Sequence, residues 1–138
     1  MANTKKFTSF SSDFFQFYNA NPKGNITCDC VIRAIAGATG KAWEDVMREL
    51  TECAIKHKLM INDPKLYTKY FKENGWVKHN QPKKAGGKKY TGWEWAPTFK
   101  GTAVAHVGDH HIVMVKDGKV WDNWFSAGGI VGNYWTKE

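Results

Sequence analysis

The first half of the chain has the hydrophobic spacing of helices. After a turn-forming segment at Asn19–Gly24, apolar residues crowd the stretch Cys30–Ala38, which predicts a short buried helix. Thr27 or Asp29 can cap its start, and Gly40 can end it in a left-handed conformation. A short buried helix of this kind needs another layer of structure to pack against.

Two more helices follow. The segment Trp43–His57 carries an apolar stripe that we expect to face inward, and this stripe consists of Trp43, Met47, Leu50 and Ala54. A third helix has clearer boundaries, because Asp63 stands in the capping position, Pro64 in the first helical position, and Asn74-Gly75 at the end. The first half is therefore predicted to be mainly helical, although Phe14–Tyr18 fits a strand or one helical turn equally well.

The second half changes to strand patterns separated by turn residues. The predicted strands are Thr102–Val107, His110–Val115, Lys119–Phe125 and Ile130–Trp135. Gly108-Asp109 and Asp117-Gly118 fit two-residue hairpin turns. Helices followed by an antiparallel meander predict an α+β domain, with N-terminal helices packed on a C-terminal antiparallel sheet and residues 1–138 in a single domain.

Composition narrows the class of protein. The chain has 138 residues, 42% of them hydrophobic and 14% aromatic, which is enough for one packed core. No apolar run reaches the roughly 20 residues of a membrane span, and the segment after Lys6 is too polar for a signal peptide. The three cysteines are an odd number, and Cys28 and Cys30 are too close together for an easy disulfide. We therefore expect a soluble, cytoplasmic protein without a membrane partner or a disulfide framework.

The net charge of +7 brings nucleic acid into consideration as a partner, although a less favoured one. Most lysines are scattered, and the one dense cluster surrounds Gly86-Gly87 within residues 83–89. Such a charge run is usually a solvated loop. Its alternative role is a phosphate or nucleic-acid contact.

Cys30 is the candidate nucleophile. At the first turn of a helix, free backbone N–H groups and the helix dipole stabilise a thiolate, so the pKa of the thiol should fall. Position alone leaves a buried structural cysteine equally open. A catalytic thiolate also needs a base and a group that orients the base.

The predicted hairpin can supply both groups. If Asp117-Gly118 forms the turn, His111 and Asp122 become diagonal neighbours on one face, with Cβ atoms about 7 Å apart. His110 and Asn123 share the opposite face with the same offset, and parity does not choose between the pairs. His106 would pair with His111 across the other hairpin and is expected to have no catalytic role.

Three segments together resemble a family of small phage- and prophage-encoded bacterial proteins that look like papain-like cysteine peptidases. They are Asn19-Ala-Asn-Pro-Lys-Gly24, then Asp29-Cys-Val-Ile-Arg-Ala-Ile-Ala36 continued by Ala38-Thr-Gly-Lys-Ala-Trp43, and finally His111-Ile-Val-Met-Val-Lys-Asp-Gly-Lys-Val-Trp-Asp122. The similarity spans nearly the whole chain. It implies a papain-like fold and a peptidase or other thiol hydrolase acting on a peptide or amide bond in the cytoplasm of a bacterial host cell.

The resemblance also implies residue roles. The family's cysteine, histidine and acid fall on Cys30, His111 and Asp122, and Arg33 belongs to the signature as a structural ion-pair residue. Papain-like enzymes typically place an oxyanion-binding glutamine about six residues before the cysteine. Here that position is Gly24, so Asn25 is the nearest amide, with the N–H of Cys30 as a second possible donor.

Two alternatives remain open at this stage. Cys28, Cys30, Cys53 and His57 are zinc-type ligands, but Cys-x-Cys is a tight spacing, and we expect neither a metal nor another cofactor. The second alternative is an inactive papain-like binding module for a host protein or nucleic acid, using residues 83–89 with Trp93 and Trp95.

Overall fold

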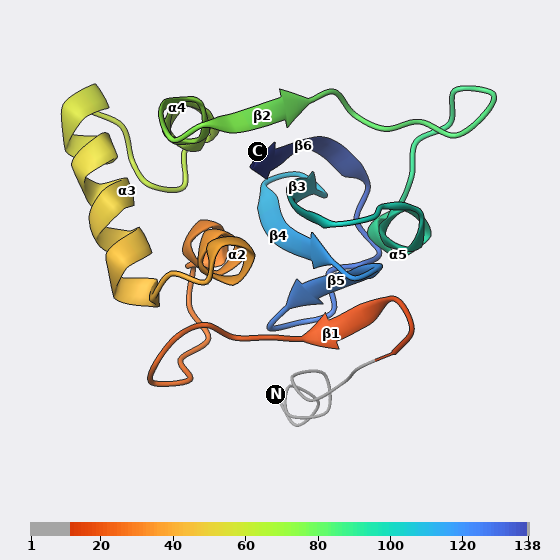
Figure 1. The fold of residues 1–138 in the computed structure, drawn as a ribbon, viewed down its shortest axis with the longest axis horizontal. Coiled ribbons are helices and arrows are strands. Elements are labelled where there is room, and N and C mark those ends of the chain that lie inside the picture. The colour runs from red at the N-terminus through yellow and green to blue at the C-terminus, as the bar shows by residue number, and fades with distance from the viewer. Residues whose placement is uncertain (1–11, 138) are drawn as a thin grey trace.

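A computed structural model describes residues 12–137 of the chain. In chain order its elements are β1 (Phe15–Phe17), α2 (Cys30–Thr39), α3 (Trp43–His57), α4 (Pro64–Glu73), β2 (Trp76–His79), α5 (Gly92–Trp95), the 3-10 turn η1 (Ala96–Thr98), β3 (Thr102–Val107), β4 (His111–Lys116), β5 (Lys119–Asp122) and β6 (Val131–Lys137). The architecture is α+β, as the sequence predicted (Figure 1). No helix in the described range is long and apolar enough to cross a membrane.

The strands form one open, mixed sheet with the order β1-β5-β4-β3-β6-β2. β1 pairs with β5 in parallel, whereas all other neighbours are antiparallel. The expectation of a purely antiparallel, C-terminal sheet was therefore wrong. The two edge strands, β1 and β2, come from the helical half of the chain. An edge strand pairs with only one neighbour, so it can come from a distant part of the sequence.

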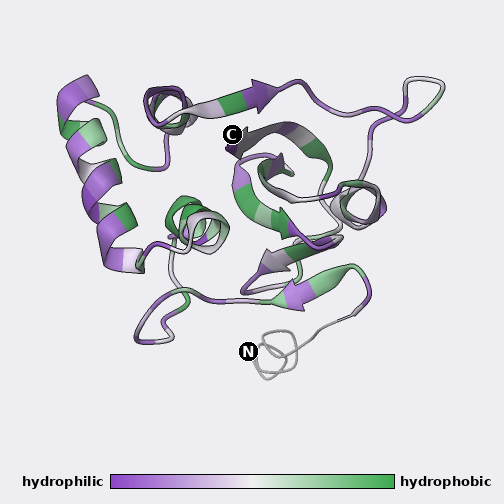
Figure 2. Ribbon diagram, viewed as in Figure 1, coloured by the Kyte–Doolittle hydropathy of each residue, from purple (hydrophilic) through white to green (hydrophobic). Residues whose placement is uncertain are grey.

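Two hydrophobic clusters lie on the two faces of the sheet. On one face, α2 packs on β4 and β3, and α3 packs on α2 (Figure 1). On the other face, α5 and η1 cover the alternate side chains of β3 and β4, such as Ala105 and Val113. Figure 2 shows α2 as largely hydrophobic and α3 as largely hydrophilic. This is expected because α2 lies between the sheet and α3, whereas α3 is an outer helix.

The helix boundaries agree closely with the sequence pattern. α3 has the predicted bounds, and the Asp63 carboxylate accepts a hydrogen bond of 2.8 Å from the backbone N–H of Lys65 at the start of α4. The expected inner stripe of α3 does face inward: Leu50 is fully buried, and Trp43, Met47 and Ala54 are partly buried against the same hydrophobic cluster. The buried face is wider than this stripe and also includes Val46 and Cys53, because α3 contacts both α2 and α4.

The two hairpins differ from each other. The turn at Asp117-Gly118 is as predicted, with Lys116 opposite Lys119. The other turn is longer: Val107 lies opposite His111, which leaves residues 108–110 in the loop. His110 is therefore a loop residue, and His106 pairs with Ile112 rather than with His111. The one-residue difference in loop length shifts the register, as it must in a hairpin.

Two elements had no clear sequence signal. β2 is a short edge strand with one fully covered residue, Trp76. α5 is a single turn begun by a capping box between Thr91 and Glu94. This turn buries Trp95, whereas Trp93 is 46% exposed. Trp95 is therefore a core residue and does not belong to the interface that the binding-module alternative would use.

Candidate active site

Cys30, His111 and Asp122 meet because each of them ends an element. Cys30 is the first residue of α2, His111 the first of β4 and Asp122 the last of β5. Cys30 is half-buried, and the His111 side chain and the backbone N–H of Ile112 lie beside its sulfur, where both favour the thiolate. The site is therefore assembled where the start of a helix reaches the end of the central hairpin.

The environment of Cys30 favours the thiolate. Burial by itself raises the pKa of the Cys30 thiol. The hydrogen bonds from His111 and Ile112, with the positive charges of His111 and Arg33, outweigh this effect, and the resulting pKa lies below the ordinary value for cysteine. A lowered pKa is the condition for a nucleophilic cysteine at neutral pH.

His111 lies between the thiol and a carboxylate. Its Nε2 is 2.5 Å from Oδ2 of Asp122, which leaves Nδ1 as the ring nitrogen available to Cys30. Burial lowers the pKa of His111, but the hydrogen bonds and negative charges of Asp122 and Cys30 raise it to about 9. The imidazolium form is therefore favoured at neutral pH. The ring of Trp124 lies against the imidazole, with 4.9 Å between centroids.

Asp122 is held by donors on both oxygens. Oδ2 accepts from His111 and from the Ser126 hydroxyl at 2.5 Å, and Oδ1 accepts from Arg33 Nη2 at 2.9 Å and from the backbone N–H of Asn123 at 2.8 Å. The carboxylate is 2% exposed. Four donors around a buried carboxylate fix its orientation, and with it the orientation of the His111 ring.

Arg33 links the acid to the start of α2. The guanidinium pairs with Asp122 and, through Nη1, with the carboxylate of Asp29, which is itself buried. Asp29 also accepts a 2.8 Å hydrogen bond from the indole N–H of Trp43 at the start of α3. Asp29 occupies the N-cap position, but its side chain makes no capping bond, since both of its oxygens serve the ion-pair network. The expected structural role of Arg33 in an ion pair is confirmed.

The rival pair does not assemble. His110 is exposed in the β3–β4 loop, and no hydrogen bond of the described residues joins it to Asn123. Asn123 is buried, and neither polar atom of its amide has a hydrogen-bond partner within residues 12–137. His106 bonds through Nε2 to the backbone oxygen of Asp109 at 2.9 Å, so it braces the hairpin loop.

A surface hollow opens beside the thiol. It is lined by Ile26, Thr27, Cys28, Cys30, Val31, Arg33, Asn62, His110, His111, Asn123 and Trp124. Asn25, the expected oxyanion residue, lies outside this set and is exposed; its backbone N–H donates to the side chain of Asn21 at 3.3 Å. The free backbone N–H groups at the start of α2 remain as candidate donors for an oxyanion next to Cys30.

Some site residues carried no signal in the sequence. Ser126 follows β5 in an irregular segment, and the N–H of Ile112 is a backbone group, so neither could be selected by residue pattern. Asp29 could have been found, since a buried acid four residues before Arg33 on a helix favours an ion pair.

The chain matches no known protein family, no curated protein and no solved structure. A thiolate paired with an imidazolium, whose other nitrogen is fixed by a carboxylate, can attack a carbonyl carbon and then deliver a proton to the leaving group.

Proposed function

We propose that the protein is a papain-like cysteine hydrolase that cleaves a peptide or other amide bond, with Cys30 as nucleophile, His111 as general acid and base, and Asp122 as orienting group. The observation that carries the proposal is the succession of the Cys30 thiol, the His111 ring beside it and Asp122, whose Oδ2 is 2.5 Å from His111 Nε2. The resemblance to small phage-encoded peptidases supports a bacterial host cytoplasm as its location.

The proposed reaction has two stages. The Cys30 thiolate bonds to the carbonyl carbon, and the His111 imidazolium gives its proton to the amine as the C–N bond breaks. The resulting thioester is then hydrolysed by a water that gives its proton to His111, which regenerates the thiolate and releases the acid. Asp122 stays ionised throughout and stabilises the imidazolium.

The hollow favours a substrate that presents an apolar group next to its reacting bond. Ile26 is 55% exposed and Trp124 47% exposed, although both line the hollow beside the thiol. Large apolar side chains exposed at a cleft commonly contact a ligand. The positive charge of Arg33 is already neutralised by its ion pairs with Asp29 and Asp122, so we do not expect Arg33 to bind a substrate carboxylate.

Alkylation tests the nucleophile. Iodoacetamide at pH 6–7 should modify Cys30 faster than Cys28, with both rates read by mass spectrometry of peptides from the same protein. Cys28 is exposed and therefore serves as an internal control for access. Only a thiol with a lowered pKa retains thiolate at this pH. A Cys30 that reacts no faster than Cys28 would exclude an activated nucleophile.

A second candidate function is a binding module that keeps the triad without turning over. The observation that favours it is the position of Asn25 outside the hollow, because loss of a side-chain oxyanion donor costs about 100-fold or more in rate. Incubation with a library of peptide amides separates the two functions. Cleavage product that forms with the wild-type protein but not with Cys30→Ala supports the hydrolase. Peptides that both proteins bind and neither cleaves support the binding module.

A further inference from the structure

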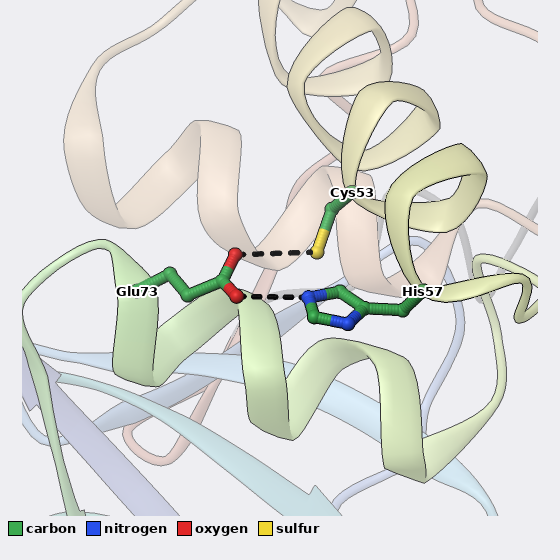
Figure 3. A group of neighbouring side chains, drawn as sticks. All are labelled: Cys53, His57 and Glu73. Carbon is green, nitrogen blue, oxygen red and sulfur yellow. Dashed lines mark hydrogen bonds and ion pairs between the residues drawn. The ribbon is translucent and has the colours of Figure 1, made fainter.

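A second group of reactive side chains lies away from the candidate active site. Cys53 and His57 occupy successive turns of α3, and Glu73 is the last residue of α4. Figure 3 shows the three side chains pointing toward one another from the two helices. The Cys53 sulfur is 3.9 Å from Oε1 of Glu73, and His57 Nε2 is 2.8 Å from Oε2.

The spacing of these atoms suits a metal ion. One ligand atom from each residue lies within 4.8 Å of the other two. Zinc bonds to sulfur at about 2.3 Å and to nitrogen or oxygen at about 2.0–2.2 Å, so tetrahedral ligands stand roughly 3.3–3.6 Å apart. The observed Cys53–Glu73 distance of 3.9 Å is slightly longer than this range and the His57–Glu73 distance of 2.8 Å slightly shorter. Rotation of the side chains can bring both into the range.

The fold supplies a field that attracts a cation. His57 ends α3 and Glu73 ends α4, so the negative ends of two helix dipoles meet at the cluster. One cation is already attracted to this place: the ammonium of Lys56 forms an ion pair with Glu73, 3.2 Å from Oε2. The Lys56 side chain is 65% exposed and can move away without disturbing the core.

The surroundings of Glu73 and Cys53 are compatible with this role. Hydrogen bonds from His57 and Lys56 lower the pKa of Glu73, so its carboxylate is charged. Burial and the Glu73 charge raise the pKa of Cys53. Metal coordination removes the proton from a cysteine thiol, so a neutral Cys53 can still serve as a ligand.

We propose that Cys53, His57 and Glu73 bind one zinc-type divalent cation, with water as the fourth ligand, and that the ion fastens α3 to α4. The mixed sulfur, nitrogen and oxygen set selects zinc over magnesium or calcium, which require oxygen ligands. This site differs from the one considered from the sequence, because Cys28 and Cys30 are not part of it. It also departs from the expectation of no metal, and it does not rest on the proposed hydrolase function.

The test is a Zn²⁺ titration of the full chain against a chromogenic chelator, with thermal unfolding recorded in parallel. We expect one equivalent to bind and to raise the melting temperature, since an ion that binds only the folded state stabilises it. His57→Gln and Cys53→Ser should each weaken binding at least about tenfold. With Co²⁺, the wild-type protein should show a sulfur-to-metal charge-transfer band that Cys53→Ser removes.

Two control variants separate this site from others. Lys56→Met should tighten Zn²⁺ binding, because it removes the competing cation from Glu73. The double variant Cys28→Ser, Cys30→Ser should bind as the wild type does. No bound equivalent, binding by His57→Gln as tight as that of the wild type, or binding that is lost in the Cys28, Cys30 variant would each overturn the proposal. If Cys53→Ser does not fold, the partly exposed His57→Gln decides.

Discussion

Two groups of side chains in this protein contain the same three chemical types, a cysteine, a histidine and a carboxylate, but they are connected differently. In the first, Cys30 contacts His111, and His111 contacts Asp122, so the histidine is in the middle. In the second, Cys53 and His57 both contact Glu73, so the carboxylate is in the middle.

The order of contacts sets the chemistry of the sulfur. The positive charge beside Cys30 lowers the pKa of its thiol against the effect of burial, whereas burial and the negative charge beside Cys53 raise the pKa of that thiol. The first arrangement prepares a nucleophile, and the second leaves a neutral thiol that needs a cation. Residue types alone therefore do not identify the function of such a group.

The largest predicted difference is in stability. Asp122→Ala should lower the free energy of unfolding by about 3–5 kcal/mol, because it leaves the buried charge of Arg33 without one of its partners. Urea unfolding measures this change. Asp122→Ala combined with Arg33→Met should recover part of the loss, and a single-variant loss below about 1 kcal/mol would contradict the proposed ion-pair network.

The second prediction concerns the titration of His111. Its ring should titrate at about 9 in the folded protein, against about 6.5 in an unfolded chain. A raised folded pKa stabilises the protein fully below the unfolded value, and this contribution is lost as the pH rises through about 9. Proton NMR of the imidazole measures the value, which should fall in Cys30→Ala as one negative partner is removed. An unchanged value in that variant would show that the thiolate is not its partner.

The third prediction is kinetic. His111→Gln should slow iodoacetamide alkylation of Cys30 at pH 6–7 by about tenfold or more, since the thiolate loses its cationic partner. The matched change His57→Gln should not slow alkylation of Cys53, because that sulfur contacts Glu73 instead. Equal slowing at both cysteines would remove the distinction between the two groups.

The smallest effect is expected at Glu73. Glu73→Gln should leave the urea midpoint of the metal-free protein almost unchanged, because exposed pairs such as those of Glu73 with Lys56 and His57 contribute little to stability. Urea unfolding of Glu73→Gln and of Asp122→Ala under the same conditions compares the two effects directly. A loss as large as that of Asp122→Ala would mean that burial does not separate the two carboxylates.

Much of the local structure could be predicted from the sequence. Pro64 after Asp63 marked the start of α4, and Asp117-Gly118 marked a hairpin whose register brought His111 toward Asp122. The hairpin at residues 108–110 was misjudged because a two-residue and a three-residue loop share the same turn residues. The edge strands β1 and β2 could not be assigned, since each is short and is defined by a distant partner.

The sequence by itself determined the helix starts, the α+β composition and the alternation that gives the sheet two apolar faces, because these depend on neighbours within a few residues. Only the tertiary structure decided which ionisable groups meet. Arg33 and Asp122 are 89 positions apart, and their ion pair exists because α2 packs against the end of the β4–β5 hairpin. Likewise, Glu73 reaches Cys53 and His57 because two helices end at the same place. Electrostatic effects depend on distance in space and on burial, and neither can be read along the chain.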